Sequence, residues 1–143
     1  MILLDAYALV AFLAGERAAA EVGSLLRAGD VAIPAPNLAE TLDVLQRVRG
    51  HSRSAVDGAL EPLLATVLRV IPADESEARL TATLRVKHYD KKTSPLSLAD
   101  CFLLAIAKAA RASLATSDPP LAAAARTEDV TCKALPDSRG RRP

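Results

Sequence analysis

The sequence has few aromatic side chains and almost no net charge. Only 3% of its 143 residues are aromatic and none is Trp, although 50% are hydrophobic. The core must therefore be built from Ala, Leu, Val and Ile, as in Ala-rich helices packed on short aliphatic strands. The formal charge is +1, from 18 basic and 17 acidic residues, so overall charge does not draw the chain to nucleic acid and any such contact must use local patches.

Cysteine patterns, long apolar runs and phosphate-binding motifs are also missing. Cys101 and Cys132 show neither a CxxC nor a Cys/His spacing, and we expect two reduced, structural thiols. No apolar run approaches the ~20 residues of a membrane span, and the N-terminus lacks the pattern of a signal peptide. We expect a soluble, cytoplasmic protein without membrane contact. The absence of GxGxxG and P-loop motifs argues against nucleotide binding of those two kinds.

Short apolar runs alternate with helical patterns along the chain, which indicates strands separated by helices. This alternation predicts a three-layer α/β/α domain with a central, mostly parallel sheet of four to five short strands, formed by residues 1–136. Polar residues 87–95 are expected to form a surface loop, and the basic residues 137–143 a disordered tail. We expect strands at 2–4, 31–33, 112–116 and 130–135, an edge strand or connector at 70–72, and helices at 6–14, 16–27, 37–49, 54–68, 74–89 and 97–111 with a short last helix from 118.

Acidic residues follow two of the predicted strands directly. Asp5 comes after residues 2–4, and Asp118 comes after the strand that ends near Thr116. In an open parallel sheet, functional groups gather at the carboxyl ends of the strands. If these two strands are neighbours, both carboxylates point into one crevice, which Glu40 and Asp100 in the first turns of two predicted helices are able to reach.

Each of these acids also has a purely structural explanation, because Asp and Glu are favoured at helix N-termini. The segments Asn37 to Glu40 and Ser97 to Asp100 fit a capping box or a close variant of it, and Asp118 before a proline fits an N-cap. However, Glu40 and Asp100 stand in segments rich in Leu and Ala, where an ionised carboxylate needs a partner. Bound Mg²⁺ or Mn²⁺ would be such a partner, because hard cations prefer oxygen ligands.

Four segments resemble the acidic motifs of PIN domains, in the same order and at similar separations over nearly the whole chain. They resemble most of all the VapC toxins of type II toxin–antitoxin pairs. Two features depart from the family pattern: Tyr7 stands where a small hydroxyl residue is frequent, and Pro119-Pro120 follow the last acid directly. The four segments are ILLDAYAL at 2–9, NLAETLDVL at 37–45, LSLAD at 96–100 and LATSD at 114–118.

The resemblance implies a metal-dependent endoribonuclease that hydrolyses RNA phosphodiester bonds and acts as the toxin of a toxin–antitoxin pair. It implies Mg²⁺ or Mn²⁺ as cofactor, an RNA substrate, a cognate antitoxin protein as partner and a homodimer. Thr116 matches a position at which the family often has a hydroxyl or amide near the metal; a structural role for this residue remains open. The catalytic and metal-binding residues implied are Asp5, Glu40, Asp100 and Asp118.

Two alternative functions remain open at this point. Another doubly wound enzyme is disfavoured, because a haloacid-dehalogenase-type phosphatase needs a second Asp where Tyr7 stands and a response-regulator receiver needs an additional acidic pair. A non-catalytic PIN-like module that binds RNA or protein would use the same acids only as helix caps. The basic residues of segments 87–92 and 139–142 are either RNA phosphate contacts or solvated surface charges.

Overall fold

A five-stranded sheet runs through the centre of the molecule, and all of its strand pairs are parallel. The structure is a computed structural model that describes residues 1–143. The strand order is β3-β2-β1-β4-β5, so the predicted parallel sheet is confirmed and the segment around residue 70 is an edge strand. The strands are β1 (Ile2–Leu4), β2 (Val31–Pro34), β3 (Leu68–Ile71), β4 (Ser113–Thr116) and β5 (Cys132–Ala134).

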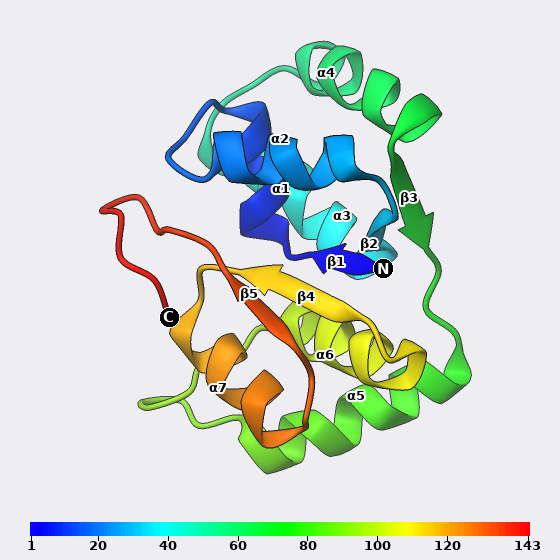
Figure 1. Cartoon of the computed structure of the whole chain (residues 1–143), viewed down its shortest axis with the longest axis vertical. Helices are drawn as coiled ribbons and strands as arrows, with labels where there is room; N and C mark the ends of the chain where they lie inside the picture. Colours follow the sequence, from blue (N-terminus) through cyan, green and yellow to red (C-terminus); the bar gives the residue numbers. More distant parts are fainter.

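Helices cover both faces of the sheet, which gives the predicted three layers (Figure 1). Strand side chains alternate between the faces: Leu3 and Leu114 belong to the core formed with α5, α6 and α7, whereas Leu4 and Ala115 belong to the core formed with α1, α2 and α4. Aliphatic residues and alanine dominate both cores, as the composition predicts. The helices of these layers are α1 (Ala6–Leu13), α2 (Ala19–Ala28), α4 (Arg53–Thr66), α5 (Glu75–His88), α6 (Leu98–Ala110) and α7 (Pro119–Thr127).

The helix expected over 37–49 differs from the prediction at both ends. Helix α3 (Ala35–Asp43) begins before Asn37 and continues into a π-helical turn over Val44–Val48. The predicted cap at Asn37 is wrong. Asn37 lies within the first turn of the helix, its side chain is fully buried, and its amide atoms have no hydrogen-bond partner. Proline fits the first turn of a helix, because its missing N–H would be unpaired there anyway. Pro36 therefore allows the earlier start, and Glu40 lies beyond the first turn.

The polar segment 87–95 is only partly a loop. Helix α5 continues to His88, and Lys87 and His88 bind the buried carboxylate of Glu128 at 2.7 and 2.6 Å. The sequence pattern did not indicate these ion pairs, because Glu128 lies 41 positions from Lys87 and 40 positions from His88. The loop proper begins after the helix, at Tyr89.

The basic C-terminal segment, for which the sequence predicts disorder, folds back onto the body in this structure. The guanidinium of Arg142 donates to both carboxylate oxygens of Glu21, at 3.1 and 2.6 Å, and to the carbonyl of Ala134 at 2.6 Å. Figure 1 shows this segment beside the end of β5. A charged tail thus lies next to the carboxyl ends of the strands.

The two cysteines are not joined to each other, and both are free thiols. Burial raises the pKa of both thiols, which disfavours their reactive thiolate form. None of the helices combines the length and hydropathy that crossing a membrane requires.

Candidate active site

The four predicted acids, Asp5, Glu40, Asp100 and Asp118, line one cavity of about 220 Å³. Asp5 follows β1 and Asp118 lies just beyond β4, and these strands are neighbours in the sheet. Helix α3 contributes Glu40, and the first turn of α6 contributes Asp100. The crevice expected from strand adjacency is therefore present, at the carboxyl edge of the sheet.

Helix capping fixes three of these carboxylates, so the structural explanation of each acid holds in part. Asp5 Oδ1 accepts from the Ala8 N–H at 2.6 Å, and Asp100 Oδ2 accepts from the Ser97 N–H at 2.8 Å. Asp118 Oδ2 accepts at 3.0 Å from Leu121, the first residue after the two prolines that has an N–H to donate. A carboxylate has two oxygens, and each of these backbone caps occupies one of them. Capping therefore does not prevent the same carboxylate from binding a ligand.

Burial and mutual repulsion make all four carboxylates hard to ionise. The pKa of Asp5 is raised to about 7, mainly by burial; hydrogen bonds from Thr116 and Ala8 oppose this rise, and the charges of Asp100 and Asp118 add to it. The pKa of Glu40 is raised by burial and then by the charge of Asp100. Burial also raises the pKa values of Asp100 and Asp118, and the charge of Asp118 adds to the effect on Asp100. These effects connect all four groups electrostatically.

No cation of the protein forms an ion pair with the four acids. Arg49 is the one basic residue that lines the cavity, and its guanidinium binds the carboxylate of Glu16 instead. Asp5 is buried and the other three acids are partly buried, and such a cluster of carboxylates without ion pairs is costly for a fold to maintain. The arrangement is therefore suited to a cation from outside the chain.

Thr116 and Tyr7 complete the surroundings of the acids. The fully buried Thr116 hydroxyl accepts from the Asp118 N–H at 2.9 Å, and it also lowers the pKa of Asp5, so it acts on two of the acids. Tyr7 lines the cavity, and its hydroxyl donates to the carbonyl of Pro136 at 3.2 Å. Tyr7 thus connects the acidic cavity to the C-terminal segment.

The lining of the cavity fits a hard divalent cation by its chemistry. It contains carboxylate oxygens but no His or Cys, and oxygen ligands are those that Mg²⁺ and Mn²⁺ prefer. The side chains do not form a complete coordination site, since no three acidic, His or Cys side chains stand close enough together to coordinate one ion. The acids share a cavity but would have to draw closer around a cation.

Sequence reasoning missed Arg49 and the apolar residues Val10 and Val44, which also line the cavity. The π-helical turn begins at Val44 and ends just before Arg49, and the Arg49 N–H donates to the Val44 carbonyl at 2.9 Å. Such turns are frequent at functional sites. Nothing in the hydrophobic pattern of this helix marks the turn, so its position was not readable from the sequence.

The sequence matches the family model described as "PIN domain" over residues 2–127. The chain belongs to the PIN-domain family. PIN domains are generally nucleases, and the four acids that line the cavity are those for which the sequence resembles the family's motifs. None of the curated proteins is similar enough in sequence to count as a match.

Several solved PIN-domain structures resemble this one. VapC20 from Mycobacterium tuberculosis, a toxin that cleaves the sarcin-ricin loop, has 25% identity and a TM-score of 0.70, over 87% of this chain and 95% of that one. FitAcB from Neisseria gonorrhoeae has 27% identity and a TM-score of 0.68, over 92% and 96% of the two chains. VapBC2 from Rickettsia felis, solved with a promoter DNA fragment, shares the fold at 19% identity and a TM-score of 0.68, over 93% and 98%.

Proposed function

We propose that this protein is a metal-dependent endoribonuclease that acts as the toxin of a toxin–antitoxin pair. The observation that carries the proposal is the convergence of four carboxylates, without a protein cation to neutralise them, on one cavity of a PIN domain. A fold that maintains such repulsion at a single site gains nothing in stability from it. The repulsion is explained if the site binds a cation for catalysis.

Asp5, Glu40, Asp100 and Asp118 would hold Mg²⁺ or Mn²⁺, and Thr116 would support them. When bound, a divalent ion lowers the pKa of a coordinated water and neutralises charge that develops on the phosphate oxygens. The chain fixes the directions of three carboxylates through their backbone caps. The Thr116 hydroxyl favours the ionised form of Asp5, which is the form that binds a cation.

The partners follow from the relatives. VapC20 is a toxin that cleaves the sarcin-ricin loop, and a toxin–antitoxin complex from Klebsiella pneumoniae shares the fold at 21% identity and a TM-score of 0.59. We therefore expect an RNA substrate, a cognate antitoxin protein and a homodimer. Two free thiols agree with a reducing, cytoplasmic location.

A thermal melt with and without Mn²⁺ tests the metal site. Ligand binding to the folded state alone stabilises it by about 2.7 kcal/mol at a hundredfold excess over Kd, so the melting temperature should rise with Mn²⁺ concentration. Asp5→Asn should reduce this rise. A non-catalytic module whose acids only cap helices predicts no response to the metal.

Cleavage is tested with total RNA in Mg²⁺ or Mn²⁺, followed by sequencing of the new 5′ ends. The wild-type chain should cut at recurrent positions. Cleavage should be lost when EDTA is added, and the Asp5→Asn variant should not cleave. Full activity of the folded Asp5→Asn variant would remove Asp5 from the mechanism. A metal-dependent melt without any cleavage would instead favour a metal-binding module without nuclease activity.

A further inference from the structure

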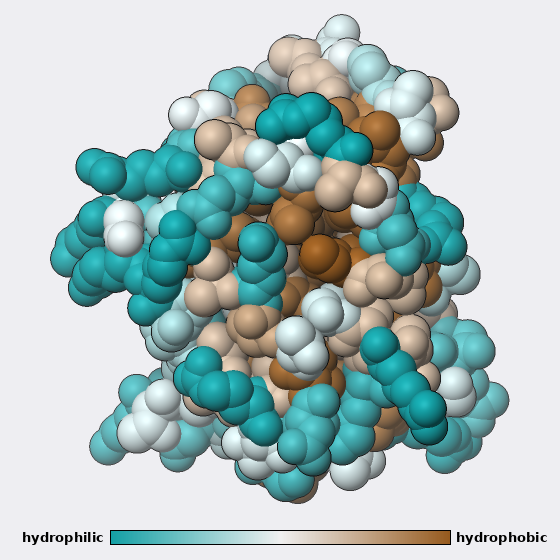
Figure 2. Space-filling model, in the orientation of Figure 1, coloured by the Kyte–Doolittle hydropathy of each residue, from teal (hydrophilic) through white to brown (hydrophobic).

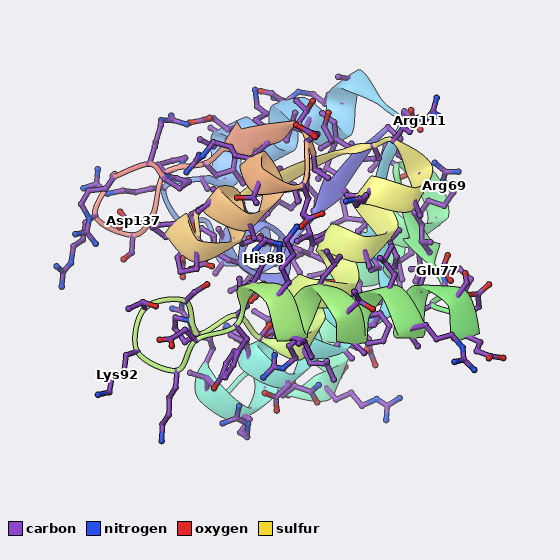
Figure 3. All side chains as sticks on the ribbon, turned by 90° about the horizontal axis from the view of Figure 1, so that it is seen from below. Arg69, Glu77, His88, Lys92, Arg111 and Asp137 are labelled. Atoms are coloured by element: carbon purple, nitrogen blue, oxygen red, sulfur yellow. The ribbon has the colours of Figure 1, made fainter.

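Two basic loops project from the side of the molecule at which the strands end. In Figure 3 the labelled residues Lys92 and Asp137 lie on loops that extend to the same side, away from Arg69 and Arg111. Figure 2 shows hydrophilic side chains gathered along this side. We name the loops by their residues: the lysine loop is Asp90–Ser94, and the arginine loop is Asp137–Arg141.

The lysine loop is closed by its own backbone and by its first residue. The Asp90 N–H donates to the Ser94 carbonyl at 3.0 Å, and the Ser94 N–H donates back at 2.9 Å. Asp90 Oδ1 accepts from the backbone of Lys92 at 2.9 Å and of Thr93 at 2.8 Å. Lys91 and Lys92 therefore stand at the tip of a short, closed loop.

The arginine loop is built in the same way. The Asp137 N–H donates to the Arg141 carbonyl at 2.7 Å, and the Gly140 N–H donates to the Asp137 carbonyl at 2.9 Å. Asp137 Oδ1 accepts from the backbone N–H groups of Arg139 and Arg141, both at 2.8 Å. In each loop, one carboxylate oxygen of the aspartate that begins the turn accepts from the backbone, and basic side chains stand at the tip.

The cations at the two tips are exposed and unpaired. The side chains of Lys91, Lys92 and Arg139 form neither an ion pair nor a hydrogen bond. Arg141 of the same loop differs from them, because it forms an ion pair with Asp137. Free cations on a closed loop lose little backbone freedom when they bind an anion, because the loop is already ordered.

The two loops are connected to the acidic cavity in different ways. The arginine loop lines a second cavity of about 550 Å³ that shares Tyr7 and Asp118 with the acidic one. The lysine loop leads directly into α6, whose first turn carries Asp100. Two basic loops on one side of the molecule are thus connected to elements that carry the acids, although the chain as a whole carries a charge of only +1.

We propose that the lysine loop and the arginine loop bind the phosphates of a single-stranded RNA and so hold it on the side of the molecule where the acidic cavity lies. The proposal rests on the proposed ribonuclease function and adds to it the residues that hold the strand. Phosphate contacts provide most of the affinity without reading sequence. The acids themselves repel RNA, so separate cations are needed to bring it close.

The test measures binding of a 5′-fluorescein-labelled 12-nucleotide RNA of mixed sequence by fluorescence anisotropy, at several salt concentrations. EDTA keeps the RNA intact. Each phosphate contact to a single strand changes the slope of log K against log salt by about 0.7. Lys91→Gln/Lys92→Gln should therefore lower the slope by about 1.4 and the low-salt affinity by about tenfold, and Arg139→Gln should lower the slope by about 0.7.

A control removes two charges that form no ion pair at the opposite edge of the sheet, although Arg27 donates to the hydroxyl of Ser24 at 3.1 Å. Arg27 and Arg111 are exposed, form no ion pair and stand just before β2 and β4 begin. Arg27→Gln/Arg111→Gln should leave the slope unchanged. All variants should keep the wild-type melting temperature, because the replaced loop side chains make no contacts of their own.

Three outcomes decide between the possibilities. An equal loss of slope in the control pair, or wild-type binding by both loop variants, overturns the proposal. Loop variants that bind RNA normally but lose affinity for an antitoxin assign the loops to that protein partner and also overturn it. If the wild-type protein binds RNA through the loops but does not cleave it in Mg²⁺ or Mn²⁺, this inference stands and only the ribonuclease function is refuted.

Discussion

Asp5 and Glu128 are both buried carboxylates, with 3% and 6% of their surfaces exposed, yet their surroundings have opposite charge. Asp5 lies among three further acids, and burial raises its pKa to about 7. Glu128 lies among Lys87, His88 and Lys108, and their hydrogen bonds lower its pKa to about 2. The first environment opposes ionisation and the second favours it.

The difference separates a stabilising site from one that the fold maintains at a cost. The Glu128 cluster joins the last turns of α5 and α6 to the residue that follows α7, so its ion pairs hold one helical layer together. The acidic cavity has no such partner, and its repulsion lowers stability at neutral pH. Proteins keep local destabilisation of this kind mainly where function requires it.

The largest expected effect is the loss of RNA cleavage in Asp100→Asn. The change removes one of the carboxylates that line the cavity, whereas the amide oxygen is still able to accept from the Ser97 N–H. We expect cleavage to fall at least ~100-fold, since even residues behind metal ligands cost 10–100-fold. Gel-based cleavage assays measure the rate, and circular dichroism checks the fold. Activity within a few fold of wild type would show that Asp100 is only a helix cap.

The matched change in the other carboxylate cluster is Glu128→Gln, which should lower stability but leave RNA cleavage intact. It leaves Lys87, His88 and Lys108 facing each other without an anion, and we expect a loss of about 1–3 kcal/mol. This is less than for a fully buried pair, because the two lysine side chains are 56% and 42% exposed. The melting temperature should drop and RNA cleavage at a permissive temperature should persist. An unchanged melting temperature would contradict the stabilising role.

The third comparison is the pH dependence of stability without metal, which has a different sign for the two clusters. Because the pKa of Asp5 is about 7 in the folded state and ordinarily 3.8, the folded chain binds an extra proton between about pH 4 and 7. Stability should therefore fall as pH rises through this window. Glu128 has a lowered pKa, so its contribution is present above about pH 4.5 and is lost as pH falls towards 2.

Melting curves in EDTA from pH 3 to 8 measure both limbs. Asp5→Asn should flatten the decline between pH 4 and 7, since the amide does not ionise and still offers an oxygen to the Ala8 N–H. Glu128→Gln should flatten the acid limb instead. If both variants keep the wild-type profile, neither carboxylate has the shifted pKa that distinguishes the clusters.

The sequence by itself determined the alternation of elements and the residues at their ends. Short apolar runs and helical patterns placed most strands and helices within a few residues, and the caps at Asp100 and Asp118 were predicted correctly. These features were readable because they depend on neighbours within one turn or one strand. The start of α3 and the π-helical turn were not, since Asn37 and Val44 follow the packing of the helix rather than its local signals.

Only the tertiary structure decided which of the charged residues face one another. The sequence shows acids that end strands, but it does not say that β1 and β4 are neighbours, which brings Asp5 and Asp118 to one cavity. It likewise gives no sign that Glu128 meets Lys87, 41 positions away. The physical reason is that local patterns fix backbone conformation, whereas electrostatic energy depends on distances in space that are set by the order of the strands.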